Sequence, residues 1–175
     1  MTDKLTPIGY KIVIVCILAF ISTIKISAQE NNIFELNVGK DLYKTIKTKS
    51  IDSKKNNSRE EFYKLSQNLH TTAYISENAI SKTNGRGDIK KLDFGDSKSF
   101  KLLSQSNYNN VELITIILKN TSDLNNKIDL TKDYKLGKLK YVFIKCYFKC
   151  NANQIKQFIT TDSNIRVFYT AQTPS

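Results

Sequence analysis

Several residue types are scarce in this chain of 175 residues, and each scarcity narrows the classes of function. Tryptophan is absent and His70 is the only histidine, which argues against a histidine-based catalytic triad or zinc site. Of the 27 basic residues, only Arg59, Arg86 and Arg166 are arginine. Arginine recognises phosphates and base edges with paired hydrogen bonds, whereas lysine offers a hydrated point charge. We therefore expect that this protein does not bind nucleic acid in a sequence-specific way.

The rest of the composition is that of an ordinary globular domain. Hydrophobic residues make up 40% and charged residues 25% of the chain, with 2 prolines and 6 glycines. These values exclude collagen-like and coiled-coil chains, and the length suits one domain. The formal net charge is +11. Such a charge favours anionic partners but carries no information about the fold.

The N-terminal segment has the features of an export signal. A thirteen-residue apolar run, Ile12 to Ile24, follows two lysines and is short for a bilayer span. Ala28 is a small residue suited to cleavage. We therefore predict a signal peptide at residues 1–28 and a single mature domain at residues 29–175, exported to the periplasm or beyond the cell. The alternative is an uncleaved leader that anchors the protein in the membrane.

Alternation of apolar and polar residues predicts the strands of the mature chain. A strongly β-branched segment covers residues 111–118, and the most pronounced strand pattern covers residues 140–149. Two short alternating segments flank Gly95 and favour a β-hairpin. The predicted strands are residues 34–38, 71–75, 92–94, 100–102, 111–118, 140–149 and 165–169.

Two helices are predicted from capping pairs followed by apolar residues at helical spacing. Ser58 and Glu61 have the spacing of a capping box, and so do Asn151 and Gln154. The first pair opens a helix over residues 59–69. The apolar residues that follow the two caps are Phe62, Leu65 and Leu69 in the first helix and Ile155, Phe158 and Ile159 in the second.

Polar segments at residues 81–87 and 120–137 are predicted to be loops. Strands and helices interleave without a regular βαβ rhythm, and no internal repeat is visible. We therefore predict a single α+β domain with a mainly antiparallel β-sheet and two short helices on one face of it.

The C-terminal part of the chain carries a resemblance. Residues 141–170 have the sequence YVFIKCYFKCNANQIKQFITTDSNIRVFYT, a strand, a capped short helix, a turn and a second strand. This segment resembles the C-terminal module of small uncharacterised exported proteins of Bacteroidota-type bacteria. The leader, which ends Ser-Ala-Gln, also resembles the leaders of exported proteins from such bacteria. Asp162 and Asn164 lie where that family often has a basic residue. The resemblance implies that the protein is exported and that its C-terminal part folds as strand, short helix and strand. It implies no catalytic residue.

Cys146 and Cys150 are the only cysteines outside the leader. Export favours a disulfide, but on one strand the two Cα atoms would be roughly 13 Å apart. A disulfide needs about 4.4–6.8 Å. We therefore expect two free thiols, unless the strand ends near Phe148 and the chain turns back. These cysteines and His70 lack metal-ligand spacing, so we expect no metal site and no cofactor.

Two further motifs have both a functional and a structural interpretation. Asp93 or Asp96, together with Glu61, could perform acid–base chemistry in a small hydrolase, although aspartate beside glycine is typical of turns. Residues Arg86-Gly87-Asp88 spell the integrin-binding tripeptide in a predicted loop. The same residues also form a favourable turn.

One face of the strand at residues 140–149 is the candidate binding site. Residues 127–156 contain eight lysines and two aspartates, a net charge of +6. Aromatic rings alternating with cations suit anionic glycans, envelope lipids or single strands. The alternative is a solvated or helix-covered face whose lysine stems lie over the rings. The residues of this face are Tyr141, Phe143, Lys145, Tyr147 and Lys149.

These observations predict a non-enzymatic exported protein, either a binding domain or an accessory domain of the cell envelope. The expected partner is an anionic envelope polymer or another protein. The alternative is a small hydrolase that uses carboxylates only. No catalytic residue is assigned.

Overall fold

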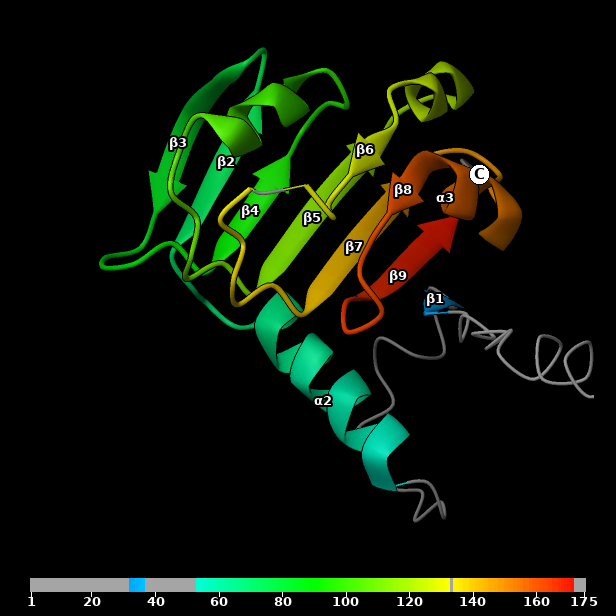
Figure 1. The fold of residues 1–175 in the computed structure, drawn as a ribbon, viewed down its shortest axis with the longest axis horizontal. Coiled ribbons are helices and arrows are strands. Elements are labelled where there is room, and N and C mark those ends of the chain that lie inside the picture. The colour runs from blue at the N-terminus through cyan, green and yellow to red at the C-terminus, as the bar shows by residue number, and fades with distance from the viewer. Residues whose placement is uncertain (1–31, 37–52, 133, 172–175) are drawn as a thin grey trace, which may run out of the picture. The chain divides into compact units, whose positions relative to one another are not determined.

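The computed structural model describes residues 32–36, 53–132 and 134–171, and a seven-stranded β-sheet runs through them (Figure 1). The strand order is β1-β9-β7-β5-β4-β2-β3. The strands of this main sheet are β1 (Ile33–Glu35), β2 (Thr72–Ser76), β3 (Ala79–Asn84), β4 (Lys91–Phe94), β5 (Leu113–Leu118), β7 (Tyr141–Cys146) and β9 (Arg166–Ala171).

Four helical segments and a second sheet complete the described part of the chain. The second sheet pairs β6 (Ile128–Asp129) with β8 (Ile159–Thr160). The α-helices are α2 (Ser53–Gln67) and α3 (Ala152–Phe158), and the 3-10 helices are η1 (Ser99–Ser104) and η2 (Thr121–Asn125).

The main sheet is mostly parallel, so the prediction of a mainly antiparallel sheet was wrong. Only β2 and β3 run antiparallel, while the other neighbouring strands pair in parallel. The error began at the predicted hairpin, because residues 100–102 lie in η1 and the next strand begins at Leu113. A parallel neighbour needs a crossover of about a dozen residues or more, which the segment from Gly95 to Glu112 supplies. The α+β class is confirmed.

Five parallel strands, β2, β4, β5, β7 and β9, follow one another both along the chain and across the sheet. Their register places Ala73, Leu92, Ile114, Val142 and Val167 in one row. Neighbouring members of this row are 19, 22, 28 and 25 residues apart in sequence. The chain therefore winds as a coil with one strand per turn, as in solenoid proteins. The unequal turns explain why the sequence shows no repeat.

The connections between these strands cover one face of the main sheet, which we call the inner face (Figure 1). Alternate strand residues point to it and pack against apolar residues of the connections. Leu103 comes from η1, Ile128 from β6, and Ile155 and Phe158 from α3. This inner core holds successive turns of the coil together.

Helix α2 packs on the opposite, outer face of the main sheet. Phe62 is fully buried and stacks on Phe168, with the ring centroids 4.3 Å apart. It meets the Phe143 ring edge-on at 5.4 Å. A helix with a buried side at Phe62 and Leu65 is confirmed, but α2 spans Ser53–Gln67 instead of the predicted residues 59–69. Because α3 packs on the inner face, the prediction that both helices share one face was wrong.

The capping box predicted for the second helix is present, and the one predicted for the first helix is not. Asn151 and Gln154 form the predicted capping box, and each side chain accepts a hydrogen bond of 3.0 Å from the other residue's amide. Ser58 does not cap a helix, because α2 already begins at Ser53. The second capping box that the structure describes joins Asn120 to Asp123 at the start of η2.

Strand β3, paired antiparallel with β2, replaces the first part of the loop predicted at residues 81–87, whereas residues 85–87 do lie in a loop. Glu77 and Asn78 connect the two strands with φ angles of 53° and 60°. Two consecutive residues with positive φ are the requirement of a type I′ hairpin turn. Asparagine tolerates this conformation, so Asn78 was the available signal for a hairpin at this point.

The predicted signal peptide, residues 1–28, lies outside the described residues. The described residues all fall within one compact unit, residues 31–175. Among the described residues, no helix combines the length and the apolar character that a membrane crossing requires. The domain boundary after residue 28 stays a prediction.

Candidate functional site

The five residues predicted to form a binding face differ in their exposure and in their position relative to β7. Tyr141 and Phe143 are 3% and 8% exposed, in the cluster that α2 covers. Lys145 lies on the outer face with its Nζ atom 5.3 Å from the centroid of the Phe143 ring. Tyr147 and Lys149 are exposed but follow the end of β7 at Cys146. The rings of Tyr141 and Phe143 are thus used in packing, and binding by Lys145, Tyr147 and Lys149 stays a prediction.

Polar contacts reinforce the docking of α2 at Tyr141. The Tyr141 hydroxyl donates to Glu61 Oε2 at 2.8 Å, and Lys140 Nζ donates to Glu61 Oε1 at 2.7 Å. Lys140 also reaches Glu112 Oε2 at 3.2 Å. The hydrogen bond from Lys140 lowers the pKa of Glu61, whereas burial raises the pKa of Tyr141. The Glu61 carboxylate is therefore engaged in holding α2 on the sheet.

The three carboxylates of the predicted alternative, a hydrolase, have separate sets of partners. Asp96 follows β4 and accepts hydrogen bonds from the Glu77 amide at 2.8 Å, from the Lys98 amide at 2.9 Å and from Ser99 Oγ at 2.8 Å. Burial opposes its ionisation, but these hydrogen bonds outweigh burial and lower its pKa. Asp93 lies on the outer face of β4, and Glu61 binds Lys140. The geometry thus gives no paired carboxylates from this set.

The Arg86-Gly87-Asp88 tripeptide lies in the exposed loop between β3 and β4. Gly87 has a φ angle of +86°, which favours glycine. Asn110 Nδ2 donates to Asp88 Oδ2 at 2.8 Å, and Lys138 Nζ donates to Asn110 Oδ1 at 2.7 Å. These bonds link the loop to the next turns of the coil. An adhesive role for the tripeptide stays a prediction.

Metal ligands do not gather in the part of the chain that the structure describes. Within residues 32–36, 53–132 and 134–171, no group of three His, Cys, Asp or Glu side chains could hold a metal ion. His70 lies between α2 and β2, and its carbonyl oxygen accepts a hydrogen bond of 2.8 Å from Thr72 Oγ1.

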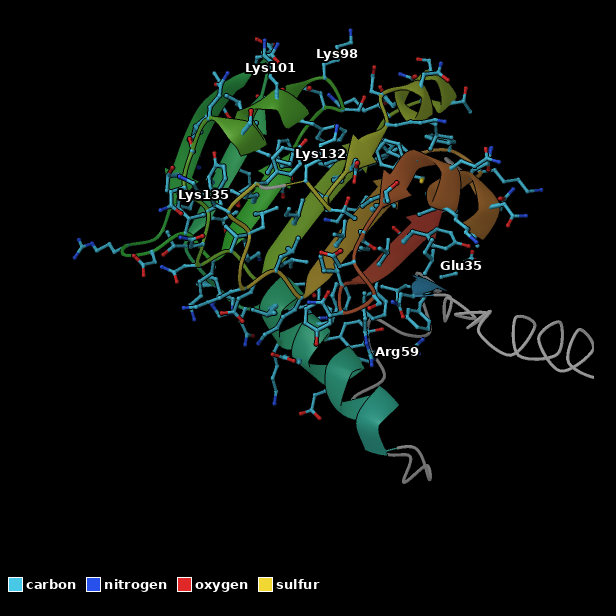
Figure 2. All side chains as sticks on the ribbon, in the orientation of Figure 1. Glu35, Arg59, Lys98, Lys101, Lys132 and Lys135 are labelled. Atoms are coloured by element: carbon cyan, nitrogen blue, oxygen red, sulfur yellow. The ribbon has the colours of Figure 1, made fainter. Side chains whose placement is uncertain are left out.

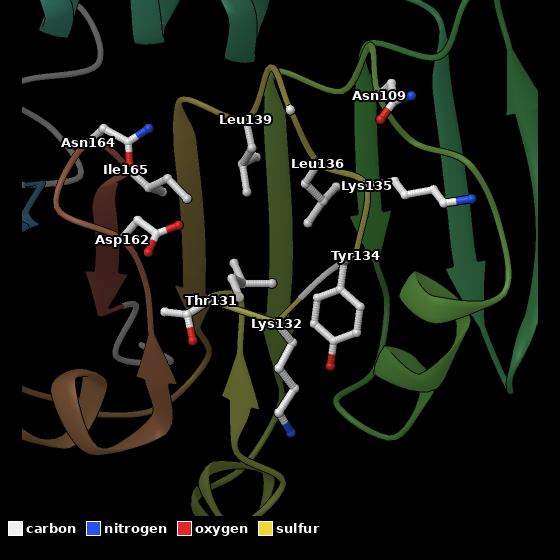
Figure 3. Close-up of a pocket in the computed structure, with 12 residues that line it drawn as sticks. Asn109, Thr131, Lys132, Tyr134, Lys135, Leu136, Leu139, Asp162, Asn164 and Ile165 are labelled. Carbon is white, nitrogen blue, oxygen red and sulfur yellow. The ribbon is translucent and has the colours of Figure 1, made fainter.

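A pocket of about 560 Å³ opens on the side of the connections (Figure 3). It lies between the segment from β6 to β7 and the turn from β8 to β9. Ligand sites typically have about 300–1,000 Å³. We call it the connection pocket, and its lining residues are Asn109, Leu130, Thr131, Lys132, Tyr134, Lys135, Leu136, Gly137, Leu139, Asp162, Asn164 and Ile165.

The connection pocket has an apolar floor and a polar rim. Leu130, Leu139 and Ile165 are each at most 5% exposed and belong to the inner core. Tyr134 and Leu136 are half-buried beside them. The rim consists of exposed polar side chains, namely Asn109, Thr131, Lys132, Lys135, Asp162 and Asn164. Asp162 is the one carboxylate among these lining residues.

Short-range hydrogen bonds shape the wall of the pocket. The Tyr134 amide donates to the Lys132 carbonyl at 2.8 Å, and the Leu139 amide donates to the Leu136 carbonyl at 2.9 Å. Lys135 has a φ angle of 50°, in the left-handed region. These turns place Tyr134 and Lys135 at the boundary with a second, smaller hollow of about 140 Å³ that both residues also line.

Lys132 and Lys135 line the connection pocket, and Lys135 also lines the smaller hollow. Figure 3 shows the Lys135 side chain extending away from the other lining residues of the connection pocket. Figure 2 shows Lys98 and Lys101, from the η1 region, on the same side of the sheet as Lys132 and Lys135. Lys138 binds Asn110 close by. The lining of the connection pocket thus contains two cations, Lys132 and Lys135.

Sequence reasoning missed the connection pocket, although one signal pointed toward it. The segment at residues 120–137 was predicted only as a long polar connection, and Tyr134 stands in it between Lys132 and Lys135. The other wall, with Asp162 and Asn164, comes from the next turn of the coil. Only the coil brings these segments together.

No protein-family model, no curated protein and no solved structure matches this chain. The geometry of the connection pocket is therefore the basis on which a function is proposed.

Proposed function

We propose that this protein is an exported, non-enzymatic binding protein whose connection pocket holds an acidic saccharide, such as a segment of an anionic envelope polymer. The observation that carries the proposal is the combination of a buried apolar floor with a rim of amide, hydroxyl and lysine side chains, in which the two lysines outnumber the one carboxylate, Asp162. Export follows from the predicted leader at residues 1–28.

The floor and the neutral part of the rim suit a sugar ring. A pyranose presents apolar C–H groups on its faces and hydroxyl groups at its edge. Leu139, Ile165 and the half-buried Tyr134 offer apolar surface to a face. Asn109 and Asn164 offer amide groups that both donate and accept hydrogen bonds, as hydroxyl groups require.

The lysines favour an acidic sugar over a neutral one. Lys132 and Lys135 both line the connection pocket, and each ammonium group carries three hydrogen-bond donors. A carboxylate or sulfate on the saccharide forms charge-assisted hydrogen bonds with such groups, which are roughly twice as strong as neutral ones. The formal net charge of +11 also favours encounter with anionic polymers.

Isothermal titration calorimetry with a heparin tetrasaccharide tests the proposal, with maltotetraose as the neutral comparison. We expect the acidic sugar to bind more tightly and to lose affinity as salt is raised. Lys132→Gln combined with Lys135→Gln should weaken binding about tenfold or more, because two positive charges at the rim of the pocket are lost. Tyr134→Ala should weaken the binding of both sugars, because it removes apolar surface from the pocket.

Lys156→Gln is the matched control, since Lys156 is an exposed lysine of α3 outside the pocket lining. Its affinity should equal that of the unaltered protein. Equal losses from Lys156→Gln and from the pocket variants would indicate a nonspecific charge effect. No binding of either sugar at low salt would contradict the proposed function.

Export has a separate test. The protein should be expressed from its full-length gene in a Gram-negative host and its intact mass measured. We expect a periplasmic product that starts at Gln29. A product of full length in the inner membrane would support the anchored alternative.

A further inference from the structure

The two cysteines after the leader lie on either side of a sharp change in chain direction. Strand β7 ends at Cys146, and the next amide, that of Tyr147, donates to the Leu118 carbonyl at 2.9 Å. Cys150 directly precedes Asn151, the N-cap of α3. The chain thus turns back within five residues. The separation of roughly 13 Å applies only to a continuous strand, and here β7 ends at Cys146, which is the alternative in which the chain turns back.

Both thiols point into the inner core and meet there. Cys146 is 0% and Cys150 is 7% exposed, and both belong to the same cluster of buried side chains. Both are free thiols, and the two groups interact with each other. A disulfide between them would bring the two sulfurs to a bond length of about 2.05 Å.

The structure around the pair keeps this arrangement in place. Cys146 is in register with Leu118 on β5 and with Ala171 on β9, so its backbone is held from both sides. Asn151 and Gln154 fix the start of α3 through the capping box. The two sulfurs therefore approach each other from two anchored backbones.

The two thiols are chemically unequal. The hydrogen bond from Cys146 lowers the pKa of Cys150 and outweighs the opposing effects of burial and of Glu35. The same hydrogen bond raises the pKa of Cys146, and burial adds to that effect. Cys150 is also the more exposed of the two. Because Cys146 is fully buried, Cys150 is the sulfur that an external oxidant would reach first.

We propose that Cys146 and Cys150 form a redox site, a dithiol that an external disulfide oxidises to an intrachain disulfide joining the end of β7 to the start of α3. The Cys150 thiolate attacks one sulfur of the oxidant, which forms a mixed disulfide and releases one thiol. Cys146 then loses its proton and attacks the Cys150 sulfur, which releases the second thiol. Two electrons pass to the oxidant disulfide, and the two protons leave on its two thiols. This proposal is independent of the ligand of the connection pocket.

The sequence offers a direct assay for the bond. Trypsin cleaves after Lys145, Lys149 and Lys156, which places Cys146 and Cys150 on separate peptides. The folded protein should be incubated with oxidised glutathione, alkylated and digested without reductant. We expect one species that contains both peptides and separates on reduction. Two separately alkylated peptides from folded protein would overturn the proposal, and so would a bond between two chains.

Two single variants test the order of the steps. Cys146→Ser keeps a donor beside Cys150, so oxidised glutathione should be trapped there as a stable mixed disulfide. Cys150→Ser should be modified at Cys146 at least about tenfold more slowly. Equal rates would overturn the assigned order. If either variant fails to fold, peptide mapping of the unaltered protein refolded in oxidised glutathione decides whether the bond forms.

Discussion

Asp93 lies on the outer face of β4, and two nearby lysines offset only part of the cost of burying its carboxylate. It is in register with Tyr74 on β2 and with Thr115 on β5. Burial raises its pKa, and the positive charges of Lys145 and Lys91 offset only part of that effect. Lys91 is itself partly buried, and its Nζ atom donates to the Ser66 carbonyl of α2 at 3.2 Å. Desolvation therefore outweighs charge pairing at this position.

The raised pKa has a definite consequence for stability. A carboxyl group whose pKa is higher in the folded chain binds protons more tightly there than in the unfolded chain. Its contribution to stability is fully present below its unfolded pKa of about 3.9 and is lost as the pH rises through its folded pKa. At neutral pH the ionised Asp93 therefore opposes folding.

Asp93→Asn is expected to raise the free energy of unfolding at pH 7 and to leave it nearly unchanged near pH 3, where the native carboxyl is already protonated. Urea denaturation at both pH values measures the difference. Asp129→Asn is a control of opposite sign, because hydrogen bonds from Thr131 lower the pKa of Asp129, so that its ionised form favours folding. An Asp93→Asn variant less stable than the unaltered protein at pH 7 would show that the lysines outweigh burial.

At the scale of single elements, α2 depends on few apolar contacts. Its sequence, SKKNNSREEFYKLSQ, is largely polar. Phe62 and Leu65 are its buried side chains in the outer cluster, and Glu61 adds hydrogen bonds to Lys140 and Tyr141. Leu69, which helical spacing placed on the same buried side, is fully exposed and lies beyond the end of the helix.

Phe62→Ala is expected to lower the free energy of unfolding by about 3–5 kcal/mol, the usual cost of removing a buried phenylalanine ring. Urea denaturation followed by circular dichroism measures it. Lys64→Ala is the matched control on the same helix, because Lys64 makes an exposed ion pair with Glu60 and should cost less than about 1 kcal/mol. Equal costs for the two variants would mean that Phe62 does not anchor α2.

The elements could be predicted from the sequence where the signal was local. β-branched residues marked β5, and the pair Asn151 and Gln154 marked the start of α3. Strand pairing could not be predicted, because alternation is the same in parallel and antiparallel strands. The sequence correctly placed Tyr141 and Phe143 on the face opposite to Val142 and Ile144, but alternation cannot distinguish a face covered by α2 from a face that binds a ligand.

At the scale of the whole molecule, the coil decides which distant residues meet. Thr131 and Asn164 line the same pocket because β6 and β8 pair in parallel and bring two successive connections together. Turns of 22, 28 and 25 residues leave no sequence period from which this contact could be derived. The candidate site was therefore missed, whereas the lysine-rich character of its neighbourhood was visible in the composition.

The same architecture implies a gradient of local stability across the main sheet. All six residues of β3 are exposed, and among the described strands β3 pairs only with β2. β5 and β7 lie inside the sheet, pair on both sides and contain mostly buried residues. In a coil each turn is stabilised by its neighbours, so the interior turns open only when adjacent ones do.

Hydrogen exchange followed by mass spectrometry should reveal this gradient. We expect peptides from Ala79–Asn84 to exchange at least about tenfold faster than those from Leu113–Leu118 and Tyr141–Cys146, because opening β3 breaks one strand pairing and exposes little apolar surface. Low concentrations of urea should accelerate exchange in β5 and β7 more than in β3, since opening the interior strands exposes more surface. Equal protection and equal urea dependence in all three strands would show instead that the coil unfolds as one cooperative unit, and that its edge is no less stable than its centre.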